Sequence, residues 1–395
     1  MYLSRLEEQM LNGEYGEATA KALKLIVRVG EALGAEKLVE VTHAHASGIS
    51  YDNIGEAGLG FIRDLHRAGG RARVFATYNP IGVELWGPSV LPAPPEFLEK
   101  QFEIIKSLEA MGFRRSVTCI PYLMRRPRLG EHLAWGESSA VAVANTLYGA
   151  RTNREGGPIA LAAAITGRIY HWGLHLDENR KPTVLLRYQG ARLAEPEAGV
   201  AGYIAGEVFQ DRVVYVDADV EAPRGVQAMC AAAAAAGSTA MCVVRGVSPE
   251  DNGPPSEVED KLSLDSRDVA RKKEEIAPAG LEEAELFFTG CPHHGPDKVY
   301  EIVRLLDSAK IKRLSRPLWV AVPGYAAREL RPIAKRLAER NVHVLPGTCI
   351  VVSRLRGVAS VVATDSVKTA FYLPRRHGVN VSLASLKEFI AYYGR

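Results

Sequence analysis

Short apolar stretches alternate with helix-forming segments along most of this chain of 395 residues. Helical patterns such as 15–32, 55–67 and 95–111 fill the intervals between them. Stretches of strand length stand at residues 38–42, 73–77, 115–118, 213–216, 239–244, 285–289, 318–322 and 342–345. This alternation predicts parallel sheets covered by helices, because neighbouring parallel strands need a crossover connection. The length allows two or three domains, which we place at 1–130, 131–222 and 223–395.

The composition argues against several classes of protein. Lysine and arginine number 49 against 46 aspartate and glutamate, for a formal net charge of +3, so no global charge favours nucleic acid or a membrane surface as a partner. The N-terminus has no apolar signal core, and Gly237 and Ser238 interrupt the uncharged stretch 225–244, which argues against a membrane span. We therefore expect a cytoplasmic protein. Residues 248–278 are charged and contain Pro and Gly, and they are expected to form an exposed excursion or a boundary.

The loops after the predicted strands are the candidates for a binding site, because the crevice of a parallel sheet lies at the carboxyl ends of its strands. The turn Ser-Gly-Ile-Ser at 47–50 offers amides and hydroxyls to an oxyanion or phosphate, or is a plain turn. Asn79 and Pro80 could orient a carboxylate or close a turn. Lys368 could pair with a substrate anion or lie on the surface. The unusual loops stand at 42–53, 77–82, 118–122, 289–295, 345–350 and 363–368.

Five cysteines, an odd number, argue against a disulfide framework. Cys119, Cys291 and Cys349 each stand in a strand-exit loop beside Pro, Gly or Thr. Cys230 lies in an alanine-rich helix and Cys242 in an apolar strand, so both are expected in the core. Three thiols in the same local setting favour a shared metal site, because thiolate ligands to iron must be brought together by loops.

Two other interpretations of the cysteine loops stay open. A zinc site could use cysteine together with His293 or His294, and a loop cysteine could act as a catalytic thiol. His43 and His45 are expected to face different ways if their strand continues. A supporting hydrogen-bonding role is therefore as open for them as direct chemistry.

A dense polar cluster surrounds the helix expected after Glu137. Glu137 and Ser138 are ordinary residues for a helix start. Arg151 and Arg154 follow the end of that helix, and the arginine fork suits a phosphate. The plain alternative is a capped core helix with a solvated exit loop.

Together these loops resemble the aconitase X family. The resemblance spans most of the chain, and the segment 137–157 is its most specific part. The matching sequences are Thr-His-Ala-His-Ala-Ser-Gly-Ile-Ser-Tyr at 42–51, Tyr-Asn-Pro-Ile-Gly at 78–82, Thr-Cys-Ile-Pro-Tyr at 118–122, Glu-Ser-Ser-Ala-Val through Ala-Arg-Thr-Asn-Arg-Glu-Gly-Gly at 137–157, Gly-Leu-His-Leu-Asp-Glu-Asn-Arg at 173–180, Gly-Cys-Pro-His at 290–293, and the loop around Cys349.

The resemblance implies an α/β protein of aconitase-like α/β/α three-layer modules with parallel sheets, and a hydro-lyase that uses an iron–sulfur cluster. Cys119, Cys291 and Cys349 would hold a [4Fe–4S] cluster with one iron open to substrate. That iron would act as a Lewis acid on the departing hydroxyl and on a carboxylate. For the archaeal branch, the implied reaction is dehydration of (R)-5-phosphomevalonate to trans-anhydromevalonate 5-phosphate in a modified mevalonate pathway to isoprenoids.

The resemblance also implies roles for single residues at the substrate. Arg151 and Arg154 would be reserve phosphate ligands. Lys368 would pair with the carboxylate or the phosphate of the substrate. Glu137 and Ser138 would hydrogen-bond its hydroxyls or the iron-bound water. The loop residues expected to surround it are Gly48, Ile49, Ser50, Asn79 and Pro80.

Complete aconitases carry a swivelling domain with a serine that acts as the base. After Lys368 there is room for only about one helix and one strand, too little for another domain. The resemblance therefore implies a heterodimer with a separate small subunit that brings this domain and the base. Glu137, Ser138 or His43 could be the base only without such a subunit. The alternatives are a cis-3-hydroxy-L-proline dehydratase of the same family, a zinc-dependent hydrolase, or a scaffold subunit with structural thiols.

Overall fold

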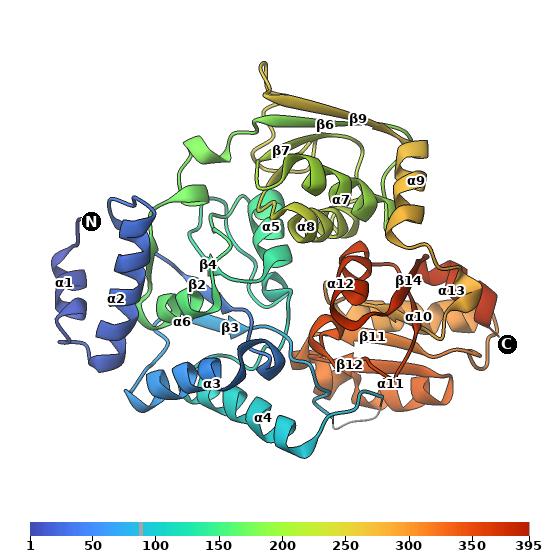
Figure 1. Cartoon of the computed structure of the whole chain (residues 1–395), viewed down its shortest axis with the longest axis horizontal. Helices are drawn as coiled ribbons and strands as arrows, with labels where there is room; N and C mark the ends of the chain where they lie inside the picture. Colours follow the sequence, from blue (N-terminus) through green and yellow to red (C-terminus); the bar gives the residue numbers. More distant parts are fainter. Residues whose placement is uncertain (87–89, 395) are drawn as a thin grey trace.

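A three-stranded parallel sheet lies at the centre of the N-terminal part of the chain. The computed structural model describes residues 1–86 and 90–394. In this sheet β2 (His43–Ala46) pairs with both β3 (Phe75–Tyr78) and β4 (Ala134–Trp135). A short antiparallel pair, β1 (Leu38–Glu40) and β5 (Arg168–Tyr170), lies beside it. The helices of this part are α1 (Arg5–Leu11), α2 (Glu17–Ala32), α3 (Tyr51–Arg67), α4 (Pro95–Ala110) and α6 (Gly157–Thr166) (Figure 1).

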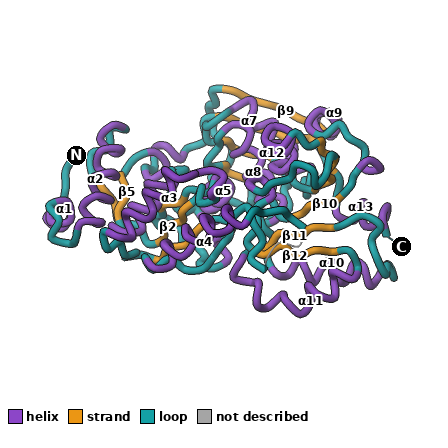
Figure 2. Tube along the Cα trace, turned by 60° about the horizontal axis from the view of Figure 1, so that its bottom comes forward, coloured by secondary structure: helices purple, strands orange, loops and turns teal. Residues whose placement is uncertain are grey.

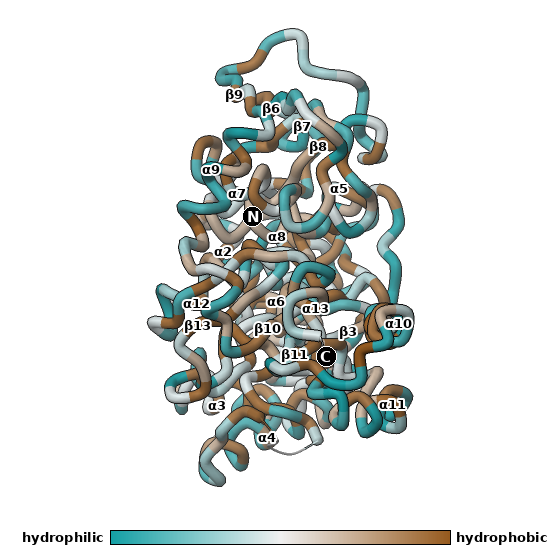
Figure 3. Tube along the Cα trace, turned by 90° about the vertical axis from the view of Figure 1, so that its right-hand side faces the viewer, coloured by the Kyte–Doolittle hydropathy of each residue, from teal (hydrophilic) through white to brown (hydrophobic). Residues whose placement is uncertain are grey.

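A four-stranded parallel sheet forms the second part. Its strand order is β8 (Cys242–Val244), β7 (Val214–Asp217), β6 (Val184–Gln189) and β9 (Asp260–Asp265). The helices beside it are α5 (Ser138–Tyr148), α7 (Glu197–Phe209), α8 (Arg224–Gly237) and α9 (Ser266–Ile276). Helices α7 and α8 are rich in alanine and glycine, and α8 lies in the interior of the molecule (Figure 3). Small side chains let these two helices approach closely.

A five-stranded parallel sheet forms the third part. Its order is β12 (Val342–Pro346), β11 (Leu318–Val322), β10 (Leu286–Thr289), β13 (Val361–Thr364) and β14 (Asn380–Leu383). Phe287 packs with α10 (Pro296–Ser308), α11 (Ala327–Glu339) and α13 (Leu386–Tyr393) on one face. Its neighbours Leu286 and Phe288 pack with α12 (Val367–His377) on the other. Because side chains alternate across a strand, a run that is apolar throughout builds a three-layer module (Figure 1, Figure 2).

The predicted α/β architecture with parallel sheets is confirmed, and two details of the predicted elements are wrong or incomplete. Residues 115–118 are not a strand; Val117 has a φ of 41°, which a continuous strand excludes. Residues 248–278 are more than an excursion, because they contain β9 and α9. The sheets do not follow the predicted divisions at 130 and 222, and the three-domain division of the chain stays a prediction.

Within the described residues, no helix has the length and apolar character needed to cross a membrane. The predicted location in the cytoplasm stays a prediction.

Two glycines make a matched test of the close contact between α7 and α8. A Cβ built on Gly237 would lie 1.8 Å from the backbone oxygen of Gly206, whereas one on Gly60, inside α3, would meet nothing within 4 Å. We expect Gly237→Ala to lower the free energy of unfolding by about 1–3 kcal/mol through overpacking. Gly60→Ala should raise it by about 0.5–1 kcal/mol. Denaturant unfolding of both variants measures this, and an unchanged midpoint for Gly237→Ala would contradict the tight helix contact.

Candidate active site

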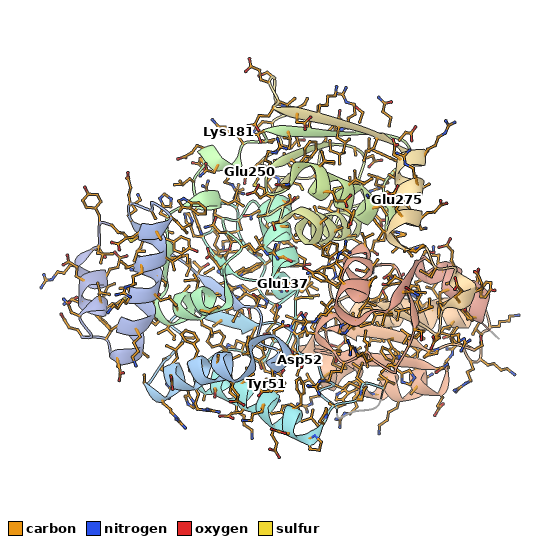
Figure 4. The ribbon with its side chains drawn as sticks, viewed as in Figure 1. Tyr51, Asp52, Glu137, Lys181, Glu250 and Glu275 are labelled. Carbon is orange, nitrogen blue, oxygen red and sulfur yellow. The ribbon has the colours of Figure 1, made fainter. Side chains whose placement is uncertain are left out.

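Two parallel sheets direct the carboxyl ends of their strands into one pocket. From the three-stranded sheet, β2, β3 and β4 lead into residues 47–50, into Asn79 and into Glu137. From the five-stranded sheet, β10, β12 and β13 lead into the loops of Cys291, Cys349 and Lys368. The pocket has a volume of about 250 Å³. Glu137 lies near the middle of the molecule, at the start of α5 (Figure 4).

The structure brings the predicted site residues together. Arg154 also lines the pocket, but Arg151 does not: Arg151 forms an ion pair with Asp177 and donates to the carbonyl of His175 at 3.1 Å. The roles of these residues stay predictions. The predicted residues that line the pocket are Gly48, Ile49, Ser50, Asn79, Pro80, Cys119, Glu137, Ser138, Cys291, Cys349 and Lys368.

A buried ion pair joins the two sheets across this pocket. Lys368 Nζ donates to Glu137 Oε1 at 2.6 Å, and the two side chains are 10% and 12% exposed. Burial alone would raise the pKa of Glu137, but the charge and hydrogen bond of Lys368, with donors from Asn79 and Ser139, hold it at about 2. Lys368 stays protonated for the same reason: burial opposes its charge, and Glu137 raises its pKa above the ordinary value. Glu137 is therefore an anionic acceptor at neutral pH and a weak base.

The three pocket cysteines carry free thiols. The backbone N–H of His293 donates to Cys119 Sγ at 3.1 Å. Burial raises the pKa of the Cys119 and Cys291 thiols, and it raises that of Cys349 to about 12. Free in this pocket, the thiols stay protonated at neutral pH, so a cation is needed to hold them as thiolates.

The described ranges 1–86 and 90–394 contain no group of three or more His, Cys, Asp or Glu side chains placed to hold a metal ion. His293 Nε2 lies 2.9 Å from the carbonyl of Thr348, and His294 Nε2 lies 2.7 Å from Thr289 Oγ1. The zinc alternative therefore gains no support. An iron–sulfur cluster makes a different demand, because each thiolate binds its own iron and the sulfurs need not converge on one point.

The expectation that His43 and His45 face different ways is wrong. His43 Nε2 and His45 Nδ1 lie 2.7 and 2.8 Å from the same atom, Thr77 Oγ1. Both histidines also make edge contacts with Trp135. Residues two apart in a strand share a face, so β2 turns both rings toward β3 and β4. His43 does not line the pocket and is no candidate for the base.

Three polar side chains of the pocket were not singled out from the sequence. Tyr372 and Arg376 follow Lys368 on α12 at spacings of four and eight, which places all three on one helix face and in the pocket lining. Asn53 lies opposite, in the first turn of α3, and its Oδ1 accepts from Arg376 Nη2 at 2.7 Å. The helical spacing from Lys368 was the available signal. Arg375 and Arg376 lie in the last turn of α12, where basic residues are common, so their position alone did not assign Arg376 to a site.

Comparisons with known proteins agree with this geometry. Models of the aconitase X domains match almost the whole chain: the first domain at 1–178, the second at 182–274 and the third at 284–394. The crystal structure of Thermococcus kodakaraensis aconitase X (holo-form) superposes with a TM-score of 0.90, at 35% identity and with 100% of each chain covered.

Two curated relatives are similar over nearly their full lengths, and a third over a smaller part. The phosphomevalonate dehydratase large subunit of Aeropyrum pernix is 40% identical, with 98% of each chain covered, and that of Thermococcus kodakarensis is 36% identical, with 99% of each covered. The cis-3-hydroxy-L-proline dehydratase of Pseudomonas aeruginosa is 30% identical over 77% of this chain and 54% of its own length. By sequence and by fold, the chain belongs to the aconitase X family.

Proposed function

We propose that this chain is the large subunit of a hydro-lyase that dehydrates (R)-5-phosphomevalonate to trans-anhydromevalonate 5-phosphate. One observation carries the proposal: the pocket combines three thiols with a buried carboxylate–lysine pair and two further arginines. Archaeal relatives that bear the name of this dehydratase match over nearly their full lengths. The reaction would belong to a modified mevalonate pathway in the cytoplasm.

The charge of the pocket favours a phosphorylated acid over hydroxyproline. Its lining contains Arg154, Lys368 and Arg376 against the single carboxylate of Glu137. Within the described residues, neither arginine pairs with a carboxylate: Arg154 donates to Ala234 O and Ser238 Oγ, and Arg376 donates to the Asn53 amide. A substrate with a phosphate and a carboxylate would neutralise this excess, whereas zwitterionic hydroxyproline would leave it uncompensated.

The donor set fits a [4Fe–4S] cluster. Cys119, Cys291 and Cys349 would supply three thiolates, which leaves one iron without a protein ligand. The His293 N–H that donates to Cys119 would stabilise its thiolate. When bound, the cluster supplies a Lewis acid for a departing hydroxyl.

The other pocket residues would bind and orient the substrate. Glu137, ionised and held by Lys368, would accept from a substrate hydroxyl, and Ser138 lies beside the same lysine, with 3.3 Å between Ser138 Oγ and Lys368 Nζ. A low pKa makes Glu137 a poor base. The base would therefore come from a small subunit, the partner that the relatives' name "large subunit" implies. The active site would then be completed in a heterodimer.

Anaerobic co-purification with the small subunit tests the proposal. We expect iron and sulfide in the complex, and loss of water from (R)-5-phosphomevalonate but not from cis-3-hydroxy-L-proline. A complex that carries a cluster but turns over only hydroxyproline would overturn the assignment of phosphomevalonate as the substrate. A colourless protein that contains zinc would overturn the proposal that the chain belongs to an iron–sulfur hydro-lyase.

Arg376→Gln tests whether Arg376 binds the phosphate of the substrate. We expect the KM for (R)-5-phosphomevalonate to rise about 10- to 100-fold, the loss of a hydrogen bond between charged groups. Competition by unphosphorylated mevalonate should be little changed. Arg375→Gln is the matched control, because Arg375 donates to Phe371 O and lies outside the pocket lining. Equal KM values for the two variants would exclude Arg376 as a phosphate ligand.

A further inference from the structure

A chain of buried hydrogen bonds runs from the pocket into the core of the three-stranded sheet. Asn79 Nδ2 donates to Glu137 Oε2 at 2.7 Å, and Asn79 Oδ1 lies 2.8 Å from His45 Nε2. His45 Nδ1 lies 2.8 Å from Thr77 Oγ1, which lies 2.7 Å from His43 Nε2. His43, His45 and Thr77 are fully buried. Only the Glu137 and Asn79 end of this chain lines the pocket.

The ion pair at one end fixes the direction of every bond near the pocket. Glu137 receives Lys368 Nζ and Ser139 Oγ on Oε1 at 2.6 and 3.0 Å, so its carboxylate is ionised and can only accept. Asn79 must therefore turn its NH₂ to Glu137 and its oxygen to His45. That oxygen also only accepts, so the proton of His45 must be on Nε2.

The direction of the hydrogen bonds is also fixed deeper in the core. Burial holds the pKa of His45 at about 4, although Asn79 and Glu137 oppose this effect, so the ring is neutral and its Nδ1 is bare. Nδ1 then accepts the one hydroxyl proton of Thr77, and Thr77 Oγ1 accepts from His43 Nε2–H. His43 Nδ1 has no partner within the described side chains. This fits a neutral ring, whose bare Nδ1 leaves no N–H donor unpaired in the core. All donors point toward Glu137.

We propose that His45, oriented by Thr77 and His43, is a positioning residue that locks the side-chain amide of Asn79 with its NH₂ toward Glu137 and the pocket. The proposal rests on the proposed function only for its catalytic consequence. One amide hydrogen of Asn79 is taken by Glu137, and the structure shows no protein acceptor for the other among the described residues. Because Asn79 lines the pocket, that hydrogen is available to an oxygen of the substrate.

Without the His45 donor, the Asn79 amide is held at one end only, by its bond to Glu137. Its side-chain oxygen then has no hydrogen-bond donor, and its second N–H is no longer held in one direction toward the pocket. An amide and its flipped form have nearly the same shape, so packing alone does not choose between them. Glu137 thus sets which end of the Asn79 amide faces the pocket, and the buried hydrogen bonds behind Asn79 hold that amide in place.

Thr77→Val and Thr77→Ser form the matched pair for the test. Valine keeps the shape but removes the hydroxyl, whereas serine keeps the hydroxyl. The first readout is the ¹⁵N spectrum of histidine-labelled full chain before cluster loading, with the His45 signals assigned by their loss in His45→Gln. We expect the neutral Nε2–H tautomer of His45 in all three proteins, because Asn79 Oδ1 accepts from Nε2 in each of them. In Thr77→Val alone we expect a downfield shift of the Nδ1 resonance, because Nδ1 has lost the hydroxyl that donates to it.

The second readout is turnover by the cluster-loaded complex. Thr77→Val should lower kcat about 10-fold, the effect of one hydrogen bond of about 1.4 kcal/mol, with unchanged iron and sulfide content, and Thr77→Ser should restore it to within about three-fold. A charged His45 or an Nδ1–H tautomer in the wild type would overturn the proposal, as would wild-type kcat in Thr77→Val. If the wild type does not dehydrate phosphomevalonate, the proposed function fails, and the tautomer measurement still decides the inference.

Discussion

Replacing Cys119 by serine is expected to abolish both iron incorporation and turnover. Cys119 is one of three thiols in the pocket and is buried, 8% exposed. A serine hydroxyl stays protonated where a thiol can be held as a thiolate by iron. Removing a residue that only hydrogen-bonds to a metal ligand lowers metal affinity or activity about 10- to 100-fold. Loss of the ligand itself should therefore lower turnover by more than about 100-fold. Iron and sulfide analysis with a dehydration assay on the anaerobic complex measures both effects.

Cys242→Ala is the control for this experiment. Cys242 is also a buried free thiol, but it lies in β8 and does not line the pocket. We expect this variant to keep its iron and its turnover. A Cys119→Ser protein with full iron content and full activity would exclude Cys119 as a ligand of the proposed cluster.

Lys368→Met is expected to destabilise the protein and to stop turnover. Breaking a buried ion pair by removing one partner leaves an uncompensated charge, at a cost of roughly 3–5 kcal/mol. Here the abandoned charge is Glu137, whose pKa would rise because burial favours the neutral acid. A protonated Glu137 would no longer offer the substrate an anionic acceptor. We expect denaturant unfolding to show the loss of stability, and kcat to fall by more than about 100-fold.

The double variant Glu137→Gln with Lys368→Met separates stability from function. Removing both charges takes away the desolvation penalty, so most of the lost stability should return. Turnover should not return, because neither the anionic acceptor nor the cation is present. If turnover recovered with stability, the pair would be a structural element and not part of the site.

The sequence predicted the sheets and the site loops better than the details of the backbone. Strands such as Leu318–Val322 are apolar throughout, which is typical of a parallel strand buried on both faces. β4 has two residues and no periodicity to detect, yet it positions Glu137. Segment 115–118 has the residues of a strand, but Thr118 N–H donates to Tyr78 O as the chain turns toward Cys119. Tertiary hydrogen bonds decided its conformation, and these have no local signal.

The site was predictable residue by residue but not as a network. Small and thiol residues after strands mark a crevice because the carboxyl ends of strands share an edge. Arg376 could be predicted only by noting that it lies eight residues after Lys368, and so on the same face of α12. The partnership of His45 with Thr77 needed the register of β2 against β3, in which these two residues are opposite each other. Register between distant strands is a property of the folded chain.

The Glu137–Lys368 ion pair also limits how early the pocket can form during synthesis of the chain. Its partners are 231 residues apart, so at ordinary synthesis rates Glu137 leaves the ribosome roughly 10 to 50 s before Lys368 does. Until then its carboxylate has no buried cation to pair with, and this side of the pocket cannot close around it. In the same way, Cys119 is synthesised well before Cys291 and Cys349, the two other cysteines of the pocket. The pocket, which is lined by residues from Ser47 to Arg376, is therefore assembled only after most of this sequence has been synthesised.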